Sequence, residues 1–268
     1  MTAPSQHGTL ALRGLTVERG GRTVVRDVSI EIPAAEVSAL LGPNGAGKSS
    51  LVLAVGGVLG ARAGSVLLNG GNLVGRRPER IRRAGIAIVP EGRRLLTDLT
   101  VEDNIRVASY SLSRADARAG RERALELFPE LSRRLSSRAR LLSGGEQQMV
   151  VLAQALVSQP RYLLIDELSL GLAPVVVNRL IPTIRAVADS GIGVLLIEQF
   201  AAVALGLARR AYIMEGGELR FSGLASELRE QPELLRSAYL LRGSSADTTT
   251  SIAPGPAPAP AADTRRPD

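Results

Sequence analysis

The stretch Gly42-Pro-Asn-Gly-Ala-Gly-Lys48-Ser49 decides the fold of this chain. It fits the pattern G-x-x-x-x-G-K-[S/T], in which backbone N–H groups surround phosphates, the lysine reaches the β and γ phosphates and the hydroxyl binds Mg²⁺. Lys48 is the sole lysine among 33 basic residues. An ammonium is a compact point charge that enters a crowded phosphate pocket, whereas a guanidinium is a wide planar fork. The sequence therefore predicts a binding site for a nucleoside triphosphate.

The residues on either side of this loop provide the context that a phosphate-binding loop requires. Val37–Leu41 is an apolar run that predicts a buried strand, and a helix is expected to begin at Lys48. Ser49 is a predicted metal ligand. The predicted nucleotide-binding residues of the loop are Gly42, Pro43, Asn44, Gly45, Ala46, Gly47, Lys48, Ser49 and Ser50.

Composition sets limits on the fold and on the cellular location. With 268 residues, of which 45% are hydrophobic, the chain is long enough for one large domain with an inserted subdomain. The absence of cysteine excludes disulfides and thiolate metal sites. The apolar stretches 51–59 and 149–157 are far shorter than the ~18 to 20 residues that span a bilayer. The N-terminus lacks the pattern of a secretory signal, so we expect a cytoplasmic protein that does not itself cross a membrane.

The formal net charge of +7 raises the question of an anionic partner. Part of this charge lies in the segment 76–94, which holds seven arginines and two glutamates. No aromatic residue is interleaved there to stack on bases. A solvated face, or a patch near lipid headgroups, is therefore favoured over a nucleic-acid site.

The order of expected strands and helices indicates an α/β fold. Short β-rich runs around Gly20-Gly21 predict antiparallel strands joined by a turn. The segment 101–160 is mostly helical in pattern. Strands buried on both faces of a parallel sheet are predicted at 85–89, 162–165 and 193–197.

Two carboxylates follow one of these buried strands. Hydrolysis of a triphosphate needs a metal and a positioned water in addition to a phosphate cradle. Asp166 is predicted to hold Mg²⁺ through its water shell, and Glu167 to orient and deprotonate the attacking water. An acidic strand end is common for other reasons, but the phosphate loop upstream favours the catalytic interpretation.

A second anion site is predicted at the string Leu142-Ser-Gly-Gly-Glu-Gln-Gln148. Ser143 and Glu146 form a capping box that opens a helix. Gly144 and Gly145 expose backbone N–H groups at the positive end of that helix. One triphosphate does not need two such sites from one chain. We therefore expect each site to face the phosphate loop of a partner in a head-to-tail pair.

Together, the phosphate loop, the 142–147 string and Asp166-Glu167 resemble the ATP-binding subunit of an ABC transporter in order and spacing. The resemblance implies an α/β fold: a P-loop NTPase core with a mostly parallel sheet, an N-terminal antiparallel β subdomain and an inserted α-helical subdomain. It implies ATP and Mg²⁺ as cofactors. It also implies two ATPs sandwiched between two subunits, with Ser143 and Gly145 on the γ-phosphate that the opposite subunit binds. The loop 169–171 then links the two sites.

The resemblance also divides the chain into parts. Residues 1–8 are expected to be a flexible N-terminus, and residues 9–242 the ABC ATPase domain. The helical subdomain is inserted at about 95–158. Residues 243–268 are Ala/Pro/Thr-rich and are expected to be a disordered tail, because such a composition cannot bury apolar surface.

Finer motifs resemble the shorter of the two ATPase subunits of branched-chain amino-acid importers. They are Ile88-Val-Pro-Glu-Gly-Arg-Arg94, Leu99-Thr-Val-Glu-Asp-Asn104, Ser169-Leu-Gly-Leu-Ala-Pro174 and Ile197-Glu-Gln199. Relatives with the same pattern serve urea and short-amide uptake, so the solute stays open. The implied partners are a second ABC ATPase (a paralogue or a second copy), two integral membrane permease subunits and, indirectly, an extracytoplasmic solute-binding protein. Nucleic acid is not expected as a partner, and the implied location is peripheral, on the cytoplasmic face of the cell membrane.

The last core strand is followed by glutamine where most ABC ATPases have a histidine that contacts the γ-phosphate. The Gln199 amide donates a hydrogen bond but cannot shuttle protons. Gln199 is therefore a minor catalytic candidate, and Glu167 and Lys48 are expected to carry hydrolysis. Leu168 replaces the proline that usually follows the catalytic glutamate.

Two further positions depart from the family's pattern. Glu91 stands where a glutamine usually senses Mg²⁺; it can ligate the metal directly, or pair with Arg93 or Arg94 instead. Arg19 stands where an aromatic side chain usually stacks on adenine. A guanidinium also stacks on a base, although a solvated arginine in a turn is the alternative.

Three other functions compete with that of an importer's motor subunit. One is a regulatory binding module that has lost catalysis, and the intact Glu167 argues against it. A soluble ABC ATPase acting on ribosomes or DNA usually has two ATPase halves or a long coiled coil, and neither pattern is found in the sequence. A P-loop kinase or GTPase leaves the 142–147 string unexplained. For the motor subunit, the groove around Glu91–Leu99 and the helical arm are expected to receive the permease's cytoplasmic coupling helix.

Overall fold

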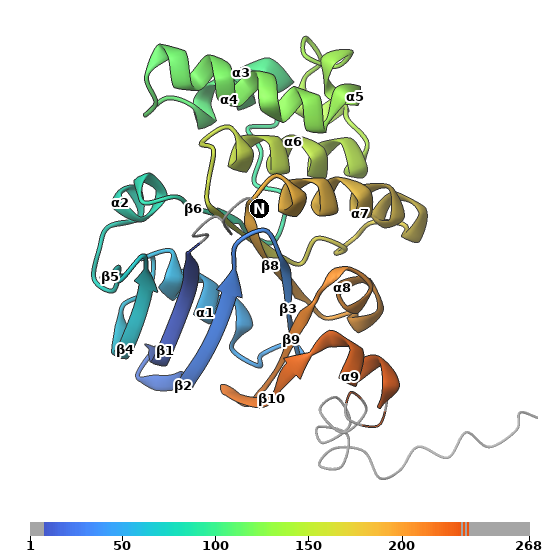
Figure 1. Ribbon diagram of the computed structural model, residues 1–268. Helices are drawn as coiled ribbons and strands as arrows, with labels where there is room; N and C mark the ends of the chain where they lie inside the picture. The colour runs from blue at the N-terminus through green and yellow to red at the C-terminus, as the bar shows by residue number, and fades with distance from the viewer. Residues whose placement is uncertain (1–7, 232, 234, 236–268) are drawn as a thin grey trace, which may run out of the picture.

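Two sheets and a lobe of helices make up the described chain. The computed structural model describes residues 8–231, 233 and 235. The predicted tail, and residues 1–7 of the predicted flexible N-terminus, lie outside the described residues. Figure 1 shows the helical lobe at the top, the smaller sheet at the lower left and the larger sheet beside it.

The smaller sheet is antiparallel and includes the predicted N-terminal hairpin. Gly20 and Gly21 join the first two strands with φ of 58° and 75°, a backbone conformation that favours glycine because it has no Cβ. The strand order is β2-β1-β4-β5. The strands are β1 (Thr9–Arg19), β2 (Arg22–Pro33), β4 (Ala61–Leu68) and β5 (Gly71–Asn72).

The larger sheet has the order β10-β9-β3-β8-β7-β6 and is parallel except at its β10 edge. Every residue of β3, β7 and β8 is buried, which explains their continuous apolar runs. The predicted mostly parallel sheet is confirmed. Its strands are β3 (Val37–Leu41), β6 (Ile86–Val89), β7 (Tyr162–Asp166), β8 (Gly193–Glu198), β9 (Arg210–Glu215) and β10 (Glu218–Leu224).

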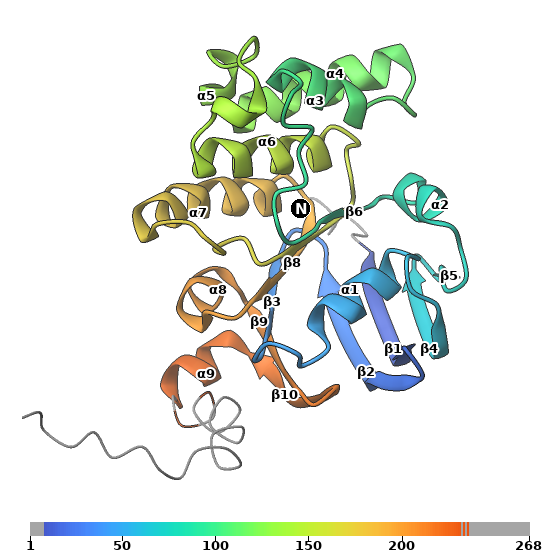
Figure 2. The ribbon, with the colours of Figure 1, turned by 180° about the vertical axis from the view of Figure 1, so that it is seen from behind.

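Helix α1 (Lys48–Val55) lies between the two sheets (Figure 2). Its Leu51 is fully buried in one apolar cluster with residues of both sheets, among them Leu12 of β1 and Leu164 of β7. A second apolar cluster covers the other face of the larger sheet. The packing of α1 places the loop 42–47 at the carboxyl end of β3, where the helix begins.

The predicted helical segment is confirmed, and two of its helices begin at predictable caps. Thr100 accepts a hydrogen bond from the Asp103 N–H, and Ser113 accepts one from the Asp116 N–H. The lobe contains α3 (Val101–Ala108), α4 (Arg114–Leu127), α5 (Pro129–Ser132) and α6 (Gly144–Leu156). The remaining helices are α2 (Pro78–Arg83), α7 (Pro174–Asp189), α8 (Ala201–Leu207) and α9 (Ala225–Glu230). Among the residues described, no helix combines the length and the apolar character needed to span a bilayer.

Helix α4 meets the end of α6 at Gly120, and this contact gives a stability prediction. A Cβ built on Gly120 would lie 2.0 Å from the carbonyl oxygen of Val157, so the two backbones would have to separate. We expect Gly120→Ala to lower the free energy of unfolding by about 1–3 kcal/mol, measured by chemical denaturation. The matched control is Gly206→Ala in α8, where an added Cβ has no neighbour within 4 Å. The control should be neutral or stabilising by up to about 1 kcal/mol, and equal effects of the two changes would contradict the prediction.

Candidate active site

The glycines of the phosphate loop are required by its geometry. Gly42, Gly45 and Gly47 have φ of 149°, 76° and 101°, in the region that L side chains avoid. A Cβ on Gly42 would lie 2.1 Å from the Met214 carbonyl oxygen, and one on Gly47 would lie 2.3 Å from the Val24 carbonyl oxygen. No residue with a side chain fits at either place, so the loop is held close against β9 and β2.

Lys48 is buried at the first position of α1, with 4% of its surface exposed. Its Nζ donates hydrogen bonds to the carbonyl oxygens of Gly42 (2.7 Å) and Pro43 (3.0 Å). Burial lowers the pKa of the ammonium, and the carboxylates of Glu167 and Asp166 oppose this shift. The loop therefore holds a compact cation over its own backbone, close to two acidic side chains.

A pocket of about 400 Å³ lies in front of the loop. It brings together the phosphate loop, the acidic residues from two strand ends and the arginine at the end of β1. It is lined by Arg19, Asn44, Gly45, Ala46, Gly47, Lys48, Ser49, Ser50, Glu91, Glu167 and Leu170. All of these except Leu170 were predicted from the sequence.

Asp166 ends strand β7 beside the loop, and 5% of its surface is exposed. Burial raises the pKa of Asp166, and a hydrogen bond with Ser49 lowers it in part. Its Oδ1 is buried and has no hydrogen-bond partner among the described residues. A buried carboxylate oxygen without a partner is costly unless a ligand or water satisfies it. This oxygen, next to a serine hydroxyl, fits a divalent cation.

Glu167 directly follows Asp166 and faces the pocket. Its backbone is in the left-handed region, with φ of 53°, and its N–H donates to the Ile197 carbonyl oxygen at 2.9 Å. Burial raises the pKa of Glu167, and the negative charges of Glu91 and Asp166 raise it further. A raised pKa brings a carboxylate closer to the range in which a general base works best.

The predicted capping box at the start of α6 is confirmed. The Ser143 N–H and Oγ donate to Oε2 of Glu146 at 2.8 and 2.9 Å, and the Glu146 N–H donates to Ser143 Oγ at 3.3 Å. Arg134 Nε donates to the other oxygen of Glu146 at 2.9 Å. The hydrogen bond from the Ser143 backbone is the main cause that lowers the pKa of Glu146, so this carboxylate stays charged.

The capping box lines a pocket of its own, of about 230 Å³. No residue lines both this pocket and the one at the phosphate loop. One chain therefore does not combine its two candidate anion sites in a single pocket. The second pocket is lined by Glu130, Ser143, Gly145, Glu146, Met149, Val176 and Arg179.

Gln199 follows β8 and does not line the pocket at the phosphate loop. We expect Gln199→Ala to slow ATP turnover only about fivefold, the equivalent of one hydrogen bond of about 1 kcal/mol. Steady-state ATPase assays of the assembled complex measure this effect. A loss as large as that of a Glu167 variant would contradict the secondary role of Gln199.

Two contacts near the site were not predicted. Glu198, with 1% of its surface exposed, accepts hydrogen bonds from the N–H (3.1 Å) and Oγ (2.7 Å) of Ser169. An acidic residue at the end of a wholly apolar run was the available signal. Arg93 does not pair with Glu91; its guanidinium donates to the carbonyl oxygens of Leu170 and Gly171 instead. Leu168, at the position where proline was expected, is fully buried in the apolar cluster around α6 and α7.

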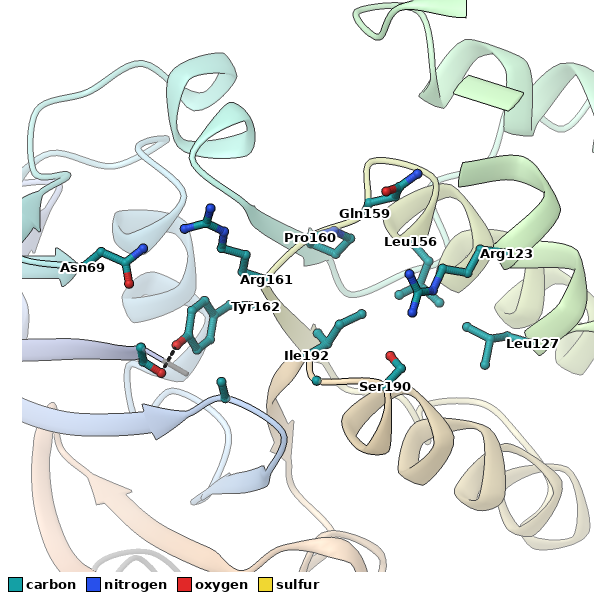
Figure 3. A pocket seen from close by; sticks show the side chains of 13 residues that line it. Asn69, Arg123, Leu127, Leu156, Gln159, Pro160, Arg161, Tyr162, Ser190 and Ile192 are labelled. Atoms are coloured by element: carbon teal, nitrogen blue, oxygen red, sulfur yellow. Dashed lines mark hydrogen bonds between the residues drawn. The ribbon is translucent and has the colours of Figure 1, made fainter. Parts of the chain in front are cut away.

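Another pocket, of about 450 Å³, lies at the opposite ends of the parallel strands (Figure 3). Figure 3 shows Arg161 at the start of β7 and Arg123 on α4 among its lining, with the Tyr162 hydroxyl bonded to the Gly8 carbonyl oxygen. None of the predicted site residues lines it. Because ligands of such sheets bind at the carboxyl ends of the strands, the pocket at the phosphate loop is the better candidate for the nucleotide site.

A buried strand, a glycine loop on a helix N-terminus and an acidic strand end beside it define a P-loop nucleoside triphosphatase. The family model described as "ABC transporter" matches residues 25–169, more than half of the chain. The chain belongs to the ABC transporter ATP-binding family and is an ATPase subunit of a transporter. Its nucleotide is therefore ATP.

Similar proteins cover almost the whole described chain. The chain is 42% identical over 216 residues to the high-affinity branched-chain amino acid transport ATP-binding protein BraG of Pseudomonas aeruginosa, covering 81% of this chain and 92% of that protein. It is 32% identical over 234 residues to the lipopolysaccharide export system ATP-binding protein LptB of Escherichia coli, with coverages of 87% and 97%. A solved structure of the ATP-binding subunit of an ABC transporter matches with a TM-score of 0.72 at 32% identity, covering 87% and 96%. The predicted family and fold class are confirmed.

Proposed function

We propose that this chain is the motor subunit that energises uptake of branched-chain amino acids through a separate membrane permease. The observation that carries the proposal is the meeting of Lys48 and Glu167 in one pocket at the phosphate loop. The similarity to BraG supports the solute class. Urea and short amides are alternative solutes, and a soluble ABC ATPase without a permease is a less favoured alternative.

The phosphate loop, residues 42–50, holds the triphosphate of ATP in this proposal. Backbone N–H groups at the start of α1 and the Lys48 ammonium neutralise the phosphate charge. Arg19, at the rim of the same pocket, stacks its guanidinium on adenine.

Mg²⁺ fits the acidic side of the pocket. The unpartnered Oδ1 of Asp166 and the Ser49 hydroxyl would hold it, with Glu91 as a further carboxylate. Among the described residues, no group of three or more acidic, histidine or cysteine side chains could hold a metal ion by itself, so phosphate oxygens and water would complete the coordination. When bound, the metal neutralises charge on the β and γ phosphates.

Glu167 is the general base in this mechanism. Its carboxylate orients a water for in-line attack on the γ-phosphate and accepts the proton that the water loses. Lys48 stabilises the negative charge that develops on the phosphate oxygens. Gln199, which follows β8 outside the lining of this pocket, would contribute at most one hydrogen bond.

The second half of each site comes from a second ABC ATPase, either a paralogue or a second copy of this chain. The N–H groups of Gly144 and Gly145 at the positive end of α6 suit a γ-phosphate bound by that partner. Ser143 and Glu146 frame this surface. The separation of the two pockets within one chain supports a head-to-tail dimer.

A fourth pocket, of about 630 Å³, suits the permease. Its lining includes the partly exposed apolar side chains of Val58, Leu96 and Val107, and Arg82 and Arg94 lie at it as well. An amphipathic helix of a permease subunit would bury these apolar side chains. Two permease subunits and an extracytoplasmic solute-binding protein complete the proposed importer, with this chain peripheral on the cytoplasmic face of the membrane.

Uptake of labelled leucine, urea and a short amide by cells that contain the complete transporter tests the proposal. We expect leucine uptake that is lost when Glu167 is replaced by Gln. Uptake of urea or the amide alone would assign the alternative solutes. Co-purification from solubilised membranes with ribosomes, and without permease subunits, would contradict a transport role.

Export is the second candidate function, because the similarity to LptB is also extensive. Leucine uptake that depends on Glu167 would exclude it. If no solute accumulates in cells although the complex hydrolyses ATP, the direction of transport in the proposal is wrong.

A further inference from the structure

The guanidinium of Arg93 reaches the turn that carries the candidate catalytic base. Arg93 lies in the loop after β6, and its Nη2 donates to the carbonyl oxygens of Leu170 at 3.0 Å and Gly171 at 3.1 Å. Both acceptors belong to the turn of residues 167–172. One nitrogen of the fork thus holds two successive carbonyl groups of that turn.

The other nitrogen of the same guanidinium lies at the start of helix α6. A Cβ built on Gly144 would be 2.8 Å from Nη1 of Arg93, and one built on Gly171 would be 3.0 Å from Nη2. Both positions are glycine, so the guanidinium approaches the two backbones directly. Arg93 therefore connects the turn after β7 with the first residue of the helix that Ser143 caps.

The backbone of Arg93 is in an uncommon conformation. Its φ is 43°, in the left-handed region that non-glycine residues rarely adopt. Its carbonyl oxygen accepts a hydrogen bond from the Leu95 N–H at 2.7 Å, which closes a tight turn. Residues in disfavoured backbone conformations persist where surrounding contacts hold them, and here the contacts of the guanidinium do so.

Hydrogen bonds within the turn 167–172 link the residues that Arg93 contacts to Glu167. The Leu170 N–H donates to the Glu167 carbonyl oxygen at 3.3 Å, and the Leu172 N–H donates to the Ser169 carbonyl oxygen at 3.1 Å. Glu198 holds the near side of the turn through Ser169. Arg93 holds its far side, so the turn is fixed from two directions.

We propose that Arg93 is a positioning residue, which fixes the turn 167–172 against helix α6 and thereby fixes the Glu167 carboxylate for hydrolysis. Arg93 does not line the ATP pocket, so it acts through the turn and not on the nucleotide. The same loop lines that pocket through Glu91 and the pocket proposed for the permease through Arg94. This inference rests on the ATPase activity and on the role of Glu167 proposed above.

Two measurements on Arg93→Ala test the inference. In the assembled complex, kcat for ATP should fall about tenfold while KM changes by less than about twofold, because a misplaced base slows the chemical step and leaves ATP binding intact. In the full chain without nucleotide, hydrogen exchange at the Leu170 and Leu172 amides should become at least about tenfold faster. The exchange measurement does not depend on transport, so it separates a failure of this inference from a failure of the proposed function.

Two control variants separate the loss of the Arg93 contacts from the loss of an arginine charge in general. Arg118→Ala removes an exposed arginine on α4 that pairs with Glu122, and should change neither quantity. Arg93→Lys keeps a charged donor that can reach the two carbonyl oxygens but loses the second nitrogen at Gly144, so it should recover only part of each quantity. Wild-type values for Arg93→Lys would overturn the contact with α6 as part of the cause. A change in only one of the two quantities for Arg93→Ala would overturn the positioning role.

Discussion

Glu167→Gln is expected to lower ATP turnover by about 10²- to 10⁴-fold, the range that a general base contributes. The amide has nearly the shape of the carboxylate but cannot accept the proton of the attacking water. Burial and the charges of Glu91 and Asp166 raise the pKa of Glu167, and Lys48 opposes this shift. The groups around Glu167 therefore set the basicity of its carboxylate. The glutamine amide is not a base, so these groups cannot restore the lost function.

The same substitution should leave ATP binding intact or tighten it. Removing one of three neighbouring negative charges lowers the repulsion that a triphosphate meets in the pocket. Steady-state ATPase assays of the complex give the rate, and titration with a fluorescent ATP analogue gives the affinity. Glu122→Gln, at an exposed ion pair on α4, is the matched control and should change neither. Equal, small losses for Glu167→Gln and Gln199→Ala would count against Glu167 as the base.

Lys48→Arg is expected to abolish most ATP binding and turnover, although both side chains carry one positive charge. Lys48 is 4% exposed, and its ammonium lies within 3.0 Å of two carbonyl oxygens of its own loop. A planar guanidinium does not fit this space without moving the loop. Charge-assisted hydrogen bonds contribute about 1.5–3 kcal/mol each. Loss of the two that Lys48 is expected to donate, one to the β and one to the γ phosphate, should therefore weaken ATP binding about 100-fold or more.

The control for this change is the reverse exchange at the surface. Arg118→Lys alters an arginine that is exposed on α4 and should leave ATP affinity and turnover unchanged. Thermal denaturation of both variants shows whether either change affects the fold. Wild-type turnover by Lys48→Arg would mean that the pocket requires only the charge and not the shape of lysine.

The parts of the fold that the sequence predicts are those with a strong local pattern. β3, β7 and β8 are buried on both faces, so their apolar runs identify them. Helix α7 did not stand out, because it contains Pro182 and a run of valines, which have low helix propensity. Its buried residues Val177, Leu180 and Ile184 nevertheless follow helical spacing. The first half of strand β4 is mostly exposed, and it lacks the large apolar residues that would predict a strand.

The candidate site also combines residues that a local motif predicts with contacts that no local motif predicts. The phosphate loop, Asp166 and Glu167 are recognisable because each chemical role needs a residue type at a fixed local spacing. The contact of Arg93 with Leu170 joins positions 77 residues apart and depends on how the loops fold together. No local pattern encodes such a contact, so it becomes visible only in three dimensions.

The capping box at Ser143 has a consequence for how the second anion site works. The hydrogen of the Ser143 hydroxyl is already donated to the Glu146 carboxylate, and its oxygen accepts from the Glu146 N–H. An arriving phosphate must therefore displace an internal anion before it gains this hydroxyl. In the proposed dimer, the Glu146 carboxylate would compete with every arriving anion for this hydroxyl, and a more highly charged anion would compete better. This competition would weaken the binding of free phosphate at the start of α6 and favour the γ-phosphate of ATP bound to the partner subunit.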